Sequence, residues 1–174
     1  MKKILLLSLF VITIYGQGQF SGVTYFDYTY DLTEDAVNDA GFGLKRVYFT
    51  YQQELSDNIS YKFQTDIDYK SSPFNVYLKN AKIDWNSSIG KITLGMQGMN
   101  IFNVTEKTWG FRFLQKSPMD KYKFSSSADM GIGYSGKINN LNYSFMYTNG
   151  SGYKENENDE HKKISAQLVY GEKK

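Results

Sequence analysis

The stretch ISYKFQTDIDYK, residues 59–70, alternates strictly between less polar and strongly polar side chains. The less polar positions are Ile59, Tyr61, Phe63, Thr65, Ile67 and Tyr69. The positions between them carry four ionisable groups. Because a β-strand sends successive side chains to opposite faces, this period of two predicts a strand with one apolar face and one wet face. Its length is close to the roughly 9–11 residues that a tilted strand needs to cross a bilayer. Strands of soluble antiparallel sheets also alternate, so this stretch alone leaves both classes open.

Seven further stretches show strand-like alternation, and polar connections separate them. They span residues 20–30, 42–55, 75–85, 90–99, 127–135, 141–148 and 162–170. Together with residues 59–70 they predict an all-β protein with eight antiparallel strands. Strict alternation places Tyr77 on an apolar face, but it also places Lys45 and Lys79 there. Lys45 lies near a strand end and can extend to a polar layer, whereas Lys79 indicates a bulge, a register shift or a face buried against another protomer.

The lengths of the connections alternate along the chain. Those after the odd-numbered strands are residues 31–41, 71–74, 100–126 and 149–160, and three of these four are long. Those after the even-numbered strands are all short: residues 56–58, 86–89 and 136–140. Outer-membrane barrels have short periplasmic turns and longer outside loops, whereas a soluble sandwich has no reason to sort its loops in this way. The sorting therefore favours an antiparallel transmembrane β-barrel.

The N-terminus has the pattern of an export signal. Met1, Lys2 and Lys3 form a basic start, and residues 4–14 are a nearly unbroken apolar run that is too short for a membrane helix. We expect residues 1–16 to be a signal peptide, with cleavage near residues 16–18, and residues 17–174 to form the barrel domain. A buried first strand is the alternative for the apolar run. The chain has no cysteine, which excludes a lipoprotein anchor after this run and any disulfide.

The charges and motifs exclude several functional classes. Without Lys2 and Lys3, the mature part has 18 basic and 18 acidic side chains, so net charge predicts no nucleic-acid partner. The single histidine, His161, has no catalytic or metal partner at a suitable spacing. The acidic residues of 155–160 lack the spacing of a calcium loop, and we expect them to be solvated. No phosphate loop, nucleophile elbow or zinc motif occurs, so we expect no enzymatic activity, no metal and no cofactor.

If the apolar faces meet lipid, the wet faces line a water-filled lumen. The candidate pore-lining residues are Arg46, Lys62, Asp66, Asp68, Lys82, Asp84 and Lys91. Lys70, Lys163, Glu54 and Asp129 extend this wall, on which basic and acidic groups nearly balance. The wall is either a generic hydrated surface crossed by ion pairs or a track that favours anions. Residues 100–126 either fold inward and narrow the lumen, or cap its mouth or pack on a neighbour.

Four segments occur in an order that resembles a known family. GFGLKRVYFTYQQELSDNISYKFQTDID, VYLKNAKIDW, TEKTWGFRF and SADMGIGYSG resemble the phosphate-selective porin O and P family and related bacterial porin-like proteins, over about residues 41–153. The resemblance implies a 16-stranded, usually trimeric outer-membrane porin whose third loop constricts the channel. It assigns Glu106, Trp109 and Arg112 to the constriction loop. Members that select phosphate line their track with arginine and lysine, whereas Arg46 and Arg112 are the only arginines here.

The leading hypothesis is an outer-membrane porin that lets small hydrophilic solutes diffuse passively, with a preference for anions such as phosphate. Its partners would be outer-membrane lipid, these solutes and further copies in a homotrimer. Eight strands are half of 16, so we expect the chain to be the N-terminal part of a longer porin. The second hypothesis is a complete, non-conducting eight-stranded barrel with a structural or adhesive role. The third is a secreted soluble sheet or lipocalin-like binder.

Overall fold

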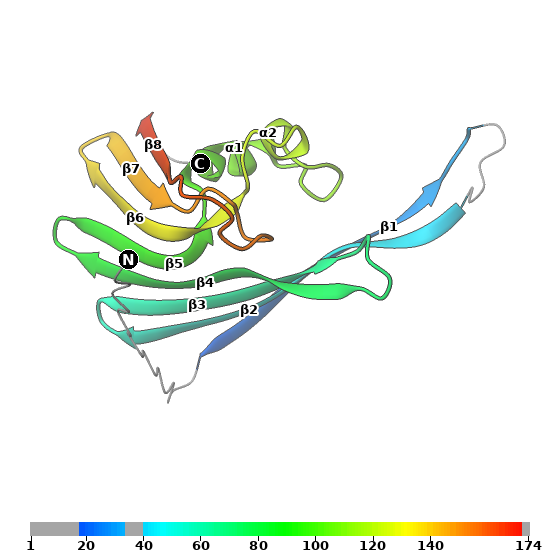
Figure 1. Cartoon of the computed structure of the whole chain (residues 1–174), viewed down its shortest axis with the longest axis horizontal. Coiled ribbons are helices and arrows are strands. Elements are labelled where there is room, and N and C mark those ends of the chain that lie inside the picture. Colours follow the sequence, from blue (N-terminus) through cyan, green and yellow to red (C-terminus); the bar gives the residue numbers. More distant parts are fainter. Residues whose placement is uncertain (1–17, 34–39, 172–174) are drawn as a thin grey trace.

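Eight strands form one antiparallel sheet in the computed structural model, which describes residues 18–33 and 40–171 (Figure 1). The strands are β1 (Gln19–Tyr30), β2 (Ala40–Ser56), β3 (Ile59–Asp68), β4 (Asn75–Ser87), β5 (Gly90–Gly98), β6 (Ala128–Ile138), β7 (Leu141–Thr148) and β8 (Lys163–Tyr170). Each strand pairs with its neighbours in sequence. The all-β prediction and all eight predicted strands are confirmed. The predicted signal peptide lies outside the described residues.

The sheet is curled but open. Within the described ranges, β1 pairs only with β2 and β8 only with β7, so each presents one unpaired edge. In Figure 1 the strands curve around α1 (Asn100–Trp109) and α2 (Pro118–Lys121), while the β1–β2 hairpin extends beyond the other strands. Closure into a barrel is therefore not observed and stays a prediction. No helix in the described part of the chain is long and apolar enough to cross a membrane.

The two faces of the sheet reverse the arrangement of a soluble protein. Polar side chains are buried on the concave face, among them Thr50, Thr93, Gln97, Ser144, Thr148 and Ser165. Large apolar side chains of the convex face are exposed, among them Phe49, Leu94, Ile132, Phe145 and Ile164. The buried apolar cluster is small and consists of Met99, Phe102 and Met146, where α1 meets the sheet. Apolar burial between layers therefore contributes little to this fold.

Residues 100–126 fold inward onto the concave face, which is one of the two arrangements predicted for them. They form two helices that the sequence pattern did not predict. No side chain caps the start of α1, and its end is set by Gly110, which has a φ of 69°. The buried side chain of Asn100 holds this start to the sheet: its Nδ2 donates to the carbonyl oxygens of Ser144 (3.2 Å) and Ser165 (3.3 Å). Tertiary contacts thus replace the missing helix cap.

Two β-bulges explain the lysines that broke the alternation. Where the pairing of β1 with β2 shifts, Lys45 has no partner opposite it and is the inserted residue of a bulge. Lys79 is the inserted residue in the same way where the pairing of β3 with β4 shifts. A bulge inserts one residue and reverses the faces beyond it. The predicted apolar position of Tyr77 is therefore wrong, because its hydroxyl donates to Asp66 Oδ2 on the concave face (3.1 Å). Of the alternatives for Lys79, the bulge is confirmed.

Candidate functional site

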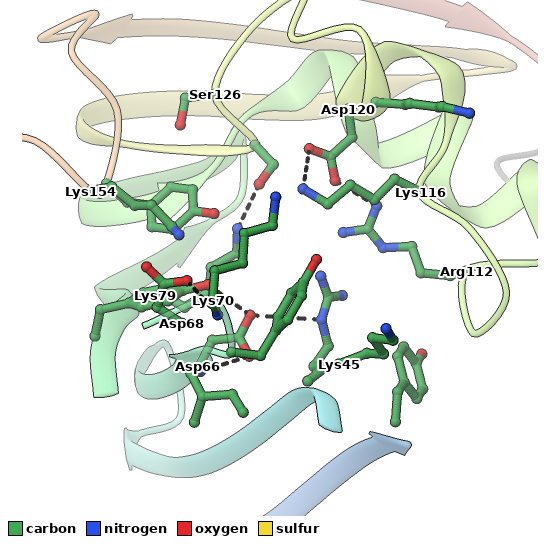
Figure 2. A pocket seen from close by; sticks show the side chains of 18 of the residues that line it. Lys45, Asp66, Asp68, Lys70, Lys79, Arg112, Lys116, Asp120, Ser126 and Lys154 are labelled. Carbon is green, nitrogen blue, oxygen red and sulfur yellow. Dashed lines mark hydrogen bonds and ion pairs between the residues drawn. The ribbon is translucent and has the colours of Figure 1, made fainter. Parts of the chain in front are cut away.

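A cavity of about 880 Å³ lies on the concave face, at the end of the sheet where the long connections are. Its walls come from β1 to β4, from the segment after α1, and from the connection between β7 and β8. Figure 2 shows basic and acidic side chains from these elements surrounding one open space. The inward fold of residues 100–126 creates this cavity, because it places a second wall opposite the sheet.

The lining of the cavity has an excess of positive charge. Nine basic side chains face five acidic ones, an excess of four. The basic residues are Lys45, Arg46, Lys70, Lys79, Arg112, Lys116, Lys121, Lys123 and Lys154. The acidic residues are Asp27, Asp66, Asp68, Asp120 and Glu155. Since the full sequence has a formal net charge of only +2, this excess is local, and it favours anions at this end of the sheet.

Arg112 is the centre of an ion-pair network within residues 100–126. Its Nη1 lies 2.5 Å from Glu106 Oε2 and 2.9 Å from Asp120 Oδ2. Partial burial opposes the charge on Arg112, but Glu106 and Asp120 outweigh it and raise the pKa of the guanidinium above its usual value. The network therefore ties α1 to α2 and keeps Arg112 charged in the cavity wall.

Arg46 and Lys45 bring charge from β2. Arg46 lies in the cavity wall 3.7 Å from Asp66 and stacks on the ring of Tyr48, with 4.6 Å between the guanidinium carbon and the ring centroid. Lys45, at its bulge, lies 3.4 Å from Asp27. Both cations thus have a carboxylate partner, which offsets part of their charge.

Lys79 differs from these because no ion pair joins it to a carboxylate in residues 18–33 or 40–171. It is only 7% exposed, its Nζ donates to Ser127 Oγ, and it lies 3.7 Å from the ring centroid of Tyr153. Lys154 makes a similar contact with Tyr77, at 4.4 Å. A hydroxyl and an aromatic face stabilise an ammonium group without neutralising it. Lys79 thus enters the cavity wall without a carboxylate partner among the described residues.

Asp129 positions the connection that carries Tyr153 and Lys154. This buried carboxylate accepts hydrogen bonds from the backbone N–H groups of Gly150 (2.8 Å) and Gly152 (3.2 Å). Both glycines have positive φ values, 100° and 87°, which side chains on L-residues disfavour. The sequence placed Asp129 on the polar wall, and the structure shows that its contacts hold a loop.

The predicted pore-lining residues fall into two groups. Arg46, Asp66 and Asp68 line the cavity. Lys62, Lys82, Asp84 and Lys91 do not; they lie nearer the short turns, on the same face of the sheet. There Asp84 lies 2.6 Å from Lys82 on the same strand and 3.9 Å from Lys91 on β5, so Asp84 joins two of these lysines, one of them across neighbouring strands.

The residues assigned to a constriction loop are also divided. Glu106 and Arg112 meet in the ion-pair network, and Arg112 lines the cavity. Trp109 does not line it: its indole Nε1 donates to the carbonyl oxygen of Gln115 (2.9 Å), and its ring lies edge-on to Phe111. Trp109 thus stabilises the turn after α1.

Sequence reasoning missed several residues of the cavity wall. Tyr77, Ser126, Ser127, Tyr153 and Lys154 all line it. The only sequence signal for this part of the site was Lys79, whose position contradicted the alternation. Tyr77 is on β4, where the bulge reverses its face, and the other missed residues come from loops, where no periodic pattern indicates which way a side chain points.

The comparisons with known proteins identify no family for this chain. No protein-family model matches the chain, and no curated protein or solved structure is similar to it. The porin resemblance stays a prediction, and the functional argument rests on the residues themselves.

Proposed function

We propose that this chain forms wall strands of a water-filled pore in a bacterial outer membrane, through which small hydrophilic solutes diffuse passively with a preference for anions. The observation that carries the proposal is the reversed polarity of the sheet. Among the described residues, thirty large apolar or aromatic side chains are exposed, twenty-one of them on the strands, while many of the buried side chains are polar or charged. Monomeric soluble proteins rarely expose contiguous apolar patches of more than a few hundred Å².

Lipid accounts for this exposure better than water does. Hydrocarbon around the convex face would remove these apolar side chains from water, at roughly 25 cal/mol per Å². The backbone of the sheet satisfies its own hydrogen bonds along seven strand pairs, as a structure in hydrocarbon must. The concave face remains wet and charged, as the lumen of a pore requires.

The open edges of the sheet favour a wide pore over a closed eight-stranded barrel. An eight-stranded barrel has an interior just wide enough for side chains to fill it or to hold one small ligand. Here the sheet leaves unpaired edges at β1 and β8, and it encloses an open cavity beside α1 and α2. Additional strands would therefore complete the wall, and a homotrimer of such barrels remains part of the proposal.

Conductance of the full-length protein tests this function. The folded protein, purified in detergent and added to a planar lipid bilayer, should produce stepwise increases in ionic current. Under a KCl gradient the reversal potential should show chloride to be more permeant than potassium, because of the positive excess in the cavity. A preparation that is folded by circular dichroism and yet produces no current would contradict the proposal, as would a mature chain that stays folded and dispersed without detergent.

A further inference from the structure

Two exposed apolar side chains occupy an unexpected place in the cavity. Phe113 and Leu114 line it, and they are 60% and 74% exposed. Other exposed aromatic residues of the same segment, Phe111, Tyr122 and Phe124, lie outside its lining. In a wall that contacts only water and inorganic ions such side chains are unfavourable, because their apolar surface stays hydrated. Phe113 and Leu114 therefore indicate that something apolar covers them.

The rest of the cavity presents cations and hydroxyl groups. Lys79 is buried at its bulge against Ser127, with no carboxylate partner among the described residues. Figure 2 shows Lys70 and Lys79 bordering the same open space as Arg112 and Lys116. Ammonium groups and hydroxyls arranged in this way suit a carboxylate, which accepts charge-assisted hydrogen bonds.

We propose that the cavity binds organic anions that carry an aromatic or apolar group beside a carboxylate. This inference rests on the proposed function and adds the class of solute. The carboxylate would contact the Lys79 side, and the apolar group would cover Phe113 and Leu114. An inorganic anion would use only the first of these contacts. The volume of about 880 Å³ lies within the range of sites for small organic molecules and far exceeds a single small ion.

Three related probes separate the two contacts. Phenylacetate has both the carboxylate and the ring, acetate has only the carboxylate, and phenylacetamide has only the ring. Each is added to a bilayer containing the full-length protein, and the concentration that halves the chloride current is measured. Covering one ring face should make phenylacetate roughly tenfold more potent than acetate. Phenylacetamide should be weaker than phenylacetate because it offers no charge to the excess of basic side chains in the cavity.

Substitutions test which side chains contact the carboxylate of the probe and which contact its ring. Lys79→Gln should weaken block by phenylacetate and acetate to a similar extent. Phe113→Ser should weaken block by phenylacetate alone and bring it close to acetate. Phe124→Ser is the matched control, because Phe124 is exposed in the same segment and does not line the cavity, whereas the ring of Phe111 lies against that of Phe113. It should leave both values unchanged.

Calorimetric titration of the folded protein in detergent gives a second readout that needs no current. Absence of chloride current with tighter binding of phenylacetate than acetate would contradict the pore and support the site. Current with equal block by phenylacetate and acetate would support the pore and overturn the site. The inference also fails if Phe113→Ser lowers folding stability but leaves the ratio of the two affinities unchanged, because Phe113 would then pack against another part of the wall.

Discussion

Leu94→Arg tests directly whether the convex face meets lipid. Leu94 is at the middle of β5, pairs across the sheet with Ile132 on β6, and is 52% exposed. If that face met water, an arginine at this position would change the free energy of unfolding by about 0.5 kcal/mol or less. At the midplane of a bilayer the same change costs about 2–4 kcal/mol. The cost in the bilayer corresponds to roughly 30- to 1,000-fold in the folding equilibrium.

The assay is guanidinium unfolding of the full-length protein from lipid vesicles, followed by the fluorescence of its tryptophans. Leu141→Arg is the matched control, because Leu141 is an exposed leucine at the start of β7, beside a short turn. Near the interface an arginine costs only about 0–1 kcal/mol. We expect Leu94→Arg to lower the free energy of unfolding by at least about 2 kcal/mol more than Leu141→Arg. Equal effects of the two substitutions would refute the reasoning about which face meets hydrocarbon.

Three further substitutions test contacts inside the concave face. Gly95→Ala should destabilise the sheet by about 1–3 kcal/mol, because Gly95 has a φ of 111° and an added Cβ would clash with the carbonyl oxygen of Ala81; chemical denaturation measures this loss. Asn100→Ala should lower stability by about 1–3 kcal/mol, since it leaves buried partners on β7 and β8 unsatisfied, and limited proteolysis should then cut within residues 100–126. Asp129→Ala should release the backbone of Gly152 and increase cleavage within residues 149–162, while the strands remain protected, as hydrogen exchange can show.

The strands could be predicted because each alternates on its own, without reference to the rest of the chain. Residues 59–70 already contain the pattern that β3 adopts, and the polar positions Lys62 and Asp66 face the concave side as expected. The short connections after the even-numbered strands favour pairing between the strands that they join, whereas the long connections do not by themselves determine a partner. Barrel closure is a different matter, since it depends on which strands meet at the edges of β1 and β8.

The site was only partly predictable because its key residues depart from local rules. The bulge at Lys79 moves Tyr77 to the concave face, and a bulge has no reliable signal apart from a misplaced residue. Helix α1 has no side-chain cap at its start, so its beginning depends on the buried contacts of Asn100 with strands far away in sequence. Likewise, the position of Tyr153, in the connection between β7 and β8, depends on Asp129, which lies on β6.

The neighbour-only pairing of the strands has a consequence for how such a gene can change. Since every strand bonds only to those beside it in sequence, two strands and their turn form a unit that can be duplicated or lost without rerouting the others. Barrel diameter grows roughly in proportion to strand number. Recombination in whole hairpins, away from those that line the cavity or hold α1, would therefore adjust the bore of the proposed channel in regular steps.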